Sequence, residues 1–241
     1  MLPSVAFGAG RPAIKGERMS SVLKNQGHHL LLYVAIGAVL YAAVMQFPDG
    51  GTRIWGLSAR DMILLSWIFA ALHQGWIVFF WRMELYLGKI RAWFGRAGFT
   101  IFRIGFVVFA SCRLLLLIPI SMATAETASI PRALSVGLFV VTTPFIVWGF
   151  YSVFVYFGVT RALGADHFDP AYRGGALERR GIFKYIPNSM YTVVLLVLYH
   201  PGLLWDSGPA LFTAAAHHAL VWTHYFCTEK PDMKEIYGAR P

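Results

Sequence analysis

The sequence predicts an all-α integral membrane protein with about six transmembrane helices. Hydrophobic residues make up 57% of the 241 positions and charged residues only 14%, whereas a soluble domain is roughly 45–50% apolar. Several windows of about 20 apolar residues are each long enough to cross a hydrocarbon core of about 30 Å. Backbone polar groups find no water there, so each window is expected to form a helix.

Apolar windows place the expected spans. Four long windows lie at about 29–47, 62–86, 99–122 and 133–160, and two shorter ones follow at about 191–204 and 209–226. The run Pro-Asp-Gly-Gly at 48–51 is typical of a turn and ends the first window. The last two windows are separated only by residues 205–208, so we expect a short helical hairpin packed inside the bundle.

Charge patterning predicts the orientation. Successive polar segments hold four Lys or Arg residues before the first span, two at 48–61, four at 82–98, one at 123–132, five at 159–188, none at 201–208 and three at 228–241. The alternation indicates six crossings with both termini cytoplasmic, in a bacterial inner membrane or the endoplasmic reticulum. The net charge of +9 therefore reflects topology and does not indicate nucleic-acid binding.

The domain organisation is simple. Residues 1–28 contain no apolar run typical of a signal peptide and are expected to be a cytoplasmic N-terminal arm. Residues 29–241 are expected to form a single membrane domain. Two cysteines, Cys112 and Cys227, do not indicate a disulfide framework, and no metal site is predicted.

Ionisable residues within apolar spans are costly to bury and are therefore functional candidates. They are His73, Glu84, Arg103, Arg113, His217, His218 and His224. His217 and His224 are two helical turns apart, about 10 Å, which is too far for one metal ion. His224 lies near Glu229 and can line a polar pocket.

The polar connection at 161–188 is long for a compact bundle and contains many aromatic and charged residues, which is typical of a functional loop. It ends in the stretch 181–191, and a second polar stretch at 228–238 follows the last apolar window. Because both stretches are expected on the cytoplasmic face, they are predicted to form one polar pocket.

The two stretches resemble signatures of the integral-membrane methyltransferases, a family that includes isoprenylcysteine carboxyl methyltransferase and the phosphatidylethanolamine N-methyltransferases. Matching positions of the first signature are Gly181, Phe183, Asn188, Met190 and Tyr191, while Pro187 and Ser189 depart from it. The second signature is matched by Glu229-Lys230-Pro231 and Glu235-Ile236-Tyr237-Gly238. The resemblance covers roughly residues 140 to 240 and is closer to the phospholipid branch.

The resemblance implies S-adenosylmethionine as the cofactor. Its pocket needs an anionic partner for the ammonium, a cationic partner for the carboxylate and an aromatic wall. Lys184 or Arg180 is a candidate for the cationic partner. The expected cofactor-binding residues are Lys184, Tyr185, Asn188, Ser189, Met190, Tyr191, Glu229 and Lys230. Glu229, His224 and Glu235 are the candidate catalytic bases, and the sequence does not choose among them.

The expected function is methyl transfer to a membrane-embedded lipid, with the amine of phosphatidylethanolamine as the first choice of acceptor. An isoprenylcysteine-type carboxylate or another small lipophilic acceptor is an alternative within the same chemistry. A sterol-reductase-like enzyme that uses NADPH and a small membrane transporter are alternatives of other classes. The expected partner is a membrane lipid.

Overall fold

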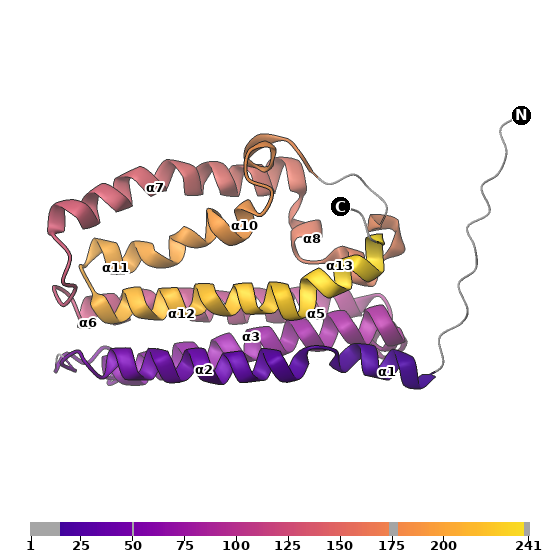
Figure 1. Cartoon of the computed structure of the whole chain (residues 1–241), viewed down its shortest axis with the longest axis horizontal. Helices are drawn as coiled ribbons and strands as arrows, with labels where there is room; N and C mark the ends of the chain where they lie inside the picture. Colours follow the sequence, from indigo (N-terminus) through magenta and orange to yellow (C-terminus); the bar gives the residue numbers. More distant parts are fainter. Residues whose placement is uncertain (1–14, 50, 174–177, 239–241) are drawn as a thin grey trace, which may run out of the picture.

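Long helices running side by side make up the fold, and the described residues contain no β-strand (Figure 1). The computed structural model describes residues 15–49, 51–173 and 178–238. Residues 1–14 of the expected N-terminal arm, positions 174–177 of the polar connection and positions 239–241 of the membrane domain lie outside these ranges.

Four stretches of the described chain are long and apolar enough to cross a membrane: Met19–Val44, Ala59–Leu87, Ala97–Ala123 and Arg132–Phe157. They contain α2 (Gln26–Val44), α3 (Ala59–Leu87), α5 (Ala97–Leu115) with α6 (Leu117–Ala123), and α7 (Arg132–Ser152). Each contains most of one of the first four predicted windows. The all-helical prediction is therefore confirmed for the described residues, and the four long windows correspond to the four helices that can cross a membrane.

The ends of α3 follow from local chemistry. Ser58 Oγ accepts a hydrogen bond from the Asp61 backbone N–H at 3.2 Å, and the Asp61 carboxylate accepts one from the Ser58 N–H at 2.9 Å. This reciprocal capping box satisfies N–H groups that have no partner inside the helix. Gly88 ends the helix at φ 61°, a conformation that glycine adopts without a Cβ clash.

The connection after α7 is compact where it is described. α7 continues into a π-helical turn at Val153–Phe157, and the short helices α8 (Val159–Ala162) and α9 (Ala165–Phe168) follow. Gly158 and Gly164 precede these helices with φ values of 86° and 75°. The chain thereby turns back on itself, and α9 packs against α3.

The C-terminal part forms two adjacent runs (Figure 1). The first contains α10 (Ser189–Thr192), a 3₁₀ segment at Val194–Tyr199 and α11 (His200–Leu204). The second contains α12 (Gly208–His224), a π-helical turn at Tyr225–Glu229 and α13 (Lys230–Tyr237). His218 of α12 lies 2.6 Å from the carbonyl oxygen of Tyr191 through Nε2, and 3.2 Å from the Tyr199 hydroxyl through Nδ1.

Part of the expected N-terminal arm is helical. The helix α1 (Lys15–Leu23) packs against α3. Arg82 of α3 donates hydrogen bonds to the carbonyl oxygens of Lys24 at 2.6 Å and Val22 at 3.1 Å. The sequence predicts no helix here, because α1 is short and polar and packs on α3 only in the folded protein.

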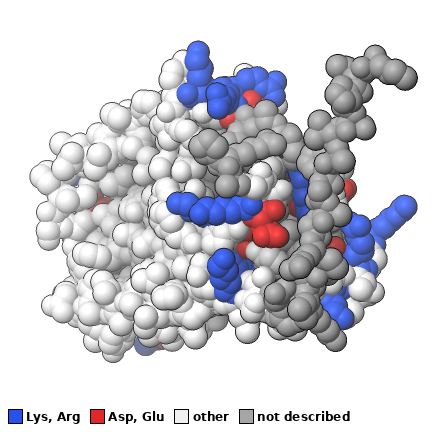
Figure 2. All heavy atoms as spheres, turned by 45° about the vertical axis from the view of Figure 1, so that its right-hand side comes forward, with Lys and Arg blue, Asp and Glu red and all other residues white. Residues whose placement is uncertain are grey.

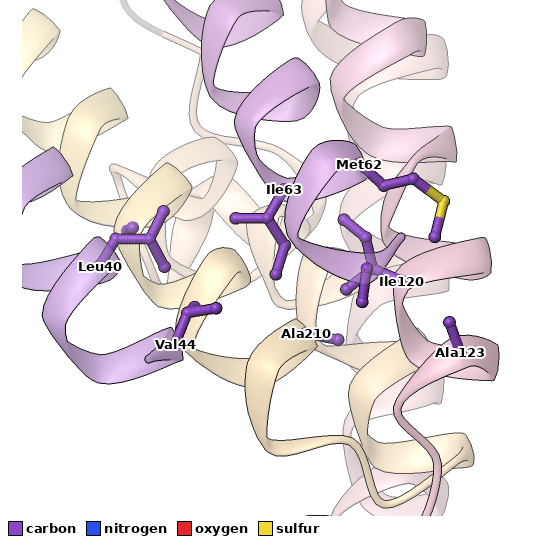
Figure 3. Packing of buried hydrophobic residues seen from close by; sticks show 9 residues of the cluster. Leu40, Val44, Met62, Ile63, Ile120, Ala123 and Ala210 are labelled. Atoms are coloured by element: carbon purple, nitrogen blue, oxygen red, sulfur yellow. The ribbon is translucent and has the colours of Figure 1, made fainter. Parts of the chain in front are cut away.

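Two clusters of buried apolar side chains lie between the helices. One cluster joins α2, α3, α6 and α12 and includes Leu40, Val44, Met62, Ile63, Ile120, Ala123 and Ala210 (Figure 3). A second, mostly aromatic cluster joins α3, α4 (Lys89–Phe94), α5 and α9 and includes Phe80, Trp81, Ile90, Phe102 and Phe168. These clusters fix the relative positions of the helices that carry the polar site.

The outer surface has an apolar part on the long helices and a charged part at one end. Large apolar side chains such as Leu31, Val140 and Val147 are 60–65% exposed on the long helices, as expected for a lipid-facing surface. Figure 2 shows charged side chains gathered on one part of the surface, where the right-hand end of Figure 1 comes forward. This charged end carries α1, α8, α9 and α13 (Figure 1).

Candidate active site

The first signature stretch is attached to the end of α7. Ser152 Oγ accepts a hydrogen bond from the Ile182 backbone N–H at 3.0 Å. Gly181 has φ 58°, and a Cβ at this position would collide with Ser152 Oγ and lie 2.8 Å from the ring of Tyr156. Only glycine fits this close approach, so Gly181 sets the path of the chain toward Tyr191.

Tyr191 and Glu229 bring the two signature stretches together. The Tyr191 hydroxyl donates a hydrogen bond to the Glu229 carboxylate. Glu229 is 9% exposed and lies at the end of the π-helical turn after α12, outside the four membrane-spanning stretches. Burial raises its pKa to about 7, although the hydrogen bond from Tyr191 acts in the opposite direction.

A buried group of acids and one histidine acts on Glu229 electrostatically. His167 lies between two carboxylates, with Nδ1 3.0 Å from Asp166 Oδ1 and Nε2 3.7 Å from Asp232 Oδ2. The Tyr237 hydroxyl donates to the other oxygen of Asp166 at 2.8 Å. The carboxylates and the imidazole are at most 2% exposed, so their charges act in a medium that screens them weakly.

The charge state of this group follows from its contacts. Burial opposes a charge on His167, but the hydrogen bond to Asp166 and the negative charges of Asp166 and Asp232 outweigh burial and raise the pKa of the imidazole. Burial also opposes ionisation of Asp166, but its hydrogen bonds to His167 and Tyr237 lower the pKa of the carboxyl. Both shifts favour the charged forms, an imidazolium at His167 and a carboxylate at Asp166.

Arg82 closes this arrangement from the side of α3. The guanidinium is fully buried, pairs with Asp232 at 3.1 Å, and donates to the carbonyl oxygen of Cys227 at 3.1 Å. The Tyr86 hydroxyl donates to Asp232 Oδ1 at 2.9 Å. Asp232 is thus held by α3, and it fixes the start of α13 next to Glu229.

The other expected bases have no hydrogen bond to Tyr191 or Glu229. His224 is buried, with its ring 5.8 Å from that of His29 and 5.6 Å from that of Trp81, and neither nitrogen has a hydrogen-bond partner in the described part of the chain. Glu235 is exposed. Of the three candidate bases, Glu229 is therefore the one that contacts the first signature.

The remaining expected cofactor-binding residues are divided between surface and interior. Lys184, Tyr185, Asn188 and Lys230 are exposed. Lys184 and Lys230 lie over the rings of Tyr185 and Phe226, while Arg180 is paired with Glu178 at 2.8 Å. Ser189 is fully buried and its Oγ has no partner among the described residues. Met190 packs with the apolar cluster around Ile182 and Phe183.

Sequence reasoning missed Arg82, Asp166, His167 and the role of Asp232. Arg82 carried a usable signal, because it is an ionisable residue near the end of an apolar span, the same signal that selected Glu84. Asp166 and His167 lie in the polar connection without a recognisable spacing, and their contacts depend on how α9 packs.

A second polar group lies in the middle of the bundle. The Arg113 guanidinium is 3.3 Å from His73 Nδ1 and donates to the carbonyl oxygen of His217 at 3.2 Å. Ser66 Oγ lies 3.3 Å from His217 Nε2. Arg113, His73 and His217, which the sequence selected as intramembrane ionisable groups, tie α3, α5 and α12 together. None of the three has a hydrogen bond to Tyr191 or Glu229.

The fold and site define a helical membrane protein whose charged end holds a buried carboxylate that accepts a hydrogen bond from a tyrosine. The model of the phospholipid methyltransferase family matches residues 131–240, which contain both signatures, the Tyr191–Glu229 pair and the buried acids. The resemblance to the integral-membrane methyltransferases is therefore confirmed, and it supports a membrane methyltransferase of phospholipid or isoprenylcysteine type. No curated protein and no solved structure matches the chain.

Proposed function

We propose that this protein transfers a methyl group from S-adenosylmethionine to a membrane lipid, with the amine of phosphatidylethanolamine as the acceptor. The observation that carries the proposal is the hydrogen bond from Tyr191 to the buried Glu229. It joins the two signature stretches within the segment that matches the phospholipid methyltransferase family. The apolar exterior supports a lipid acceptor, because the bilayer delivers such a molecule to the protein laterally.

The residues around Tyr191 fit the cofactor's chemistry. Its ammonium requires an anion, and Glu229 supplies a buried carboxylate. Its carboxylate requires a cation, for which the exposed Lys184 is available. Ser189 Oγ is a buried polar atom without a partner in the described part of the chain, and such an atom is expected to bind a ligand. When bound, the cofactor supplies a methyl group on a positively charged sulfur.

Glu229 is the proposed general base. An alkylammonium has no free electron pair and must lose a proton before its nitrogen can form a bond to carbon. With a pKa of about 7, the Glu229 carboxylate accepts that proton near neutral pH, where a base is most useful. Tyr191 orients the carboxylate, and the remaining contribution is positioning, which needs no covalent bond to the protein.

Two measurements test this proposal. Isothermal titration in detergent should detect binding of S-adenosylmethionine and none of NADPH, which distinguishes a methyltransferase from a reductase. Expression in a host that lacks phosphatidylcholine should yield methylated phosphatidylethanolamine in lipid extracts, and Tyr191→Ala should abolish this product while the protein still inserts. Arg179→Gln, on the exposed surface, is the matched control. Cofactor binding without any methylated lipid would overturn the choice of acceptor, and binding of NADPH alone would overturn the enzyme class.

A further inference from the structure

A cavity of about 710 Å³ lies at the charged end, apart from Tyr191 and Glu229. Its volume is in the range of small-molecule sites. The end of α3, the short helix α4 and the start of α5 form one side, and α9 with the residues around it forms the other. The lining residues are Glu84, Ile90, Arg91, Gly95, Arg96, Gly98, Phe99, Arg103, Thr160, Ala165, Phe168, Asp169 and Tyr172.

Three arginines and two acidic residues, Glu84 and Asp169, line this cavity, so its charged lining is net positive. Arg91 is held in place, because it donates to the carbonyl oxygen of Phe168 at 2.7 Å and lies 3.6 Å from the Glu84 carboxylate. Arg96 and Arg103 are exposed and form no ion pair within the described residues; the guanidinium of Arg103 lies over the ring of Phe99 at 5.7 Å. Two guanidinium groups are thus free to bind an anion, and the planar guanidinium suits phosphate oxygens.

The cavity also has apolar lining residues. Phe99 is partly exposed, and Phe168 is 8% exposed. The helix α4 connects two membrane-spanning helices and exposes Trp93 by 52% and Phe94 by 43%. Aromatic residues in such a position are typical of the headgroup layer. A ligand at this site therefore meets both guanidinium groups and apolar side chains.

The cavity is separated from the candidate active site by α9. Ala165 and Phe168 line the cavity, whereas Asp166 and His167 of the same helix contact Tyr237 and Asp232 in the candidate active site. Most of the lining lies before residue 131, outside the segment that matches the family. The cavity and the candidate active site are neighbours, but neither Tyr191 nor Glu229 lines the cavity.

We propose that this cavity binds a phosphate ester through Arg96 and Arg103, as part of an anionic phospholipid whose apolar portion contacts Phe99 and Phe168. Neither Tyr191 nor Glu229 lines the cavity, and the proposal does not depend on the methyltransferase assignment. A lipid headgroup and a soluble phosphate share the chemistry that the arginines recognise, so the experiment distinguishes these two sources.

The test measures binding to the full chain in a nonionic detergent by microscale thermophoresis. The probes are dihexanoyl phosphatidic acid, inorganic phosphate, and dihexanoylglycerol, which lacks the phosphate. Phosphatidic acid should bind, dihexanoylglycerol should not, and the double variant Arg96→Gln/Arg103→Gln should weaken binding about tenfold, as expected for the loss of two exposed charge pairs. Arg179→Gln, an exposed arginine that does not line the cavity, should bind like the parent protein.

The outcomes separate the possibilities. If inorganic phosphate competes with phosphatidic acid at similar concentrations and loses affinity in the double variant, the phosphate-ester site stands and its source is soluble. Binding of dihexanoylglycerol as tight as that of phosphatidic acid, or equal losses in the double variant and in Arg179→Gln, would overturn the proposal. So would no binding at all. The thermal midpoint of the double variant without ligand should match the parent protein, because both arginines are exposed.

Discussion

Glu229 is the residue at which the two signature stretches meet, and its carboxylate is the proposed partner of the cofactor's ammonium. Glu229→Gln keeps the shape of the side chain and removes its charge. Losing one charge-assisted hydrogen bond costs about 1.5–3 kcal/mol, so we expect S-adenosylmethionine to bind roughly 10- to 150-fold more weakly. Isothermal titration of the detergent-solubilised protein measures this, and an unchanged affinity would remove Glu229 from the cofactor site.

Tyr191→Phe tests the proposed base through its pH dependence. The hydrogen bond from Tyr191 lowers the pKa of Glu229, which burial alone would raise above about 7. Removing the hydroxyl therefore raises this pKa, and a base must be deprotonated to act. We expect the acidic limb of the kcat/KM profile to move to higher pH in the variant. A limb that stays in place would show that Glu229 is not the group that titrates.

Arg82 and Asp232 form the buried ion pair that supports the site. Removing one partner leaves the other charge buried and uncompensated, which costs about 3–5 kcal/mol. Arg82→Gln should therefore lower the thermal midpoint strongly, whereas Arg179→Gln on the surface should change stability by no more than about 0.5 kcal/mol. Circular dichroism melting in detergent compares them, and equal midpoints would mean that the pair does not hold α13.

Only part of this residue-scale arrangement could be predicted from the sequence. The motif resemblance selected Tyr191 and Glu229, and charge patterning placed both on one face, so their contact followed. Asp166 and His167 carry no motif, and they reach Asp232 only because α9 folds back against α3. A buried charge network of this kind depends on tertiary packing, which apolar periodicity does not encode.

At the scale of elements, the four long helices were predictable because each is an apolar run longer than a bilayer is thick. The segments without a strong apolar period were not. α1 is a short polar helix held through Arg82, and the run from α10 to α11 alternates α and 3₁₀ turns. The π-helical turn at Tyr225–Glu229 could not be predicted from the sequence either, although it determines where Glu229 lies relative to Tyr191.

Gly181 tests whether the first signature depends on its close contact with α7. Gly181→Ala forces alanine into φ 58° and adds a Cβ that collides with Ser152 Oγ. The control is Gly88→Ala, at φ 61° with no atom within 4 Å of the added Cβ. The control should cost about 1–2 kcal/mol from backbone strain alone, and Gly181→Ala roughly 1–3 kcal/mol more from overpacking. Thermal melting compares the two, and equal losses would show that Ser152 and Tyr156 yield to the new methyl group.

For the whole molecule, the distribution of charge and the fold agree. The polar segments rich in Lys and Arg, including α1, the connection after α7 and α13, come together at one end (Figures 1 and 2). The loop between α2 and α3, which holds few positive charges, lies at the opposite end (Figure 1). Segments rich in Lys and Arg therefore lie at one end of the bundle, and the loop with few positive charges lies at the other. The six crossings and the cytoplasmic termini remain predictions.

Cysteine labelling tests that topology. Asp49, Lys184 and Glu235 are exposed, and each can be replaced by cysteine in a Cys112→Ser background that keeps the buried Cys227. Because positive charge favours the cytoplasmic side, positions 184 and 235 should be protected from an impermeant maleimide added outside intact cells, and position 49 should react. Labelling of 184 and 235 should appear once the membrane is permeabilised. If 184 and 235 react from opposite sides, the two signature stretches cannot form one site; if all three react from outside, the orientation inferred from Lys and Arg is wrong.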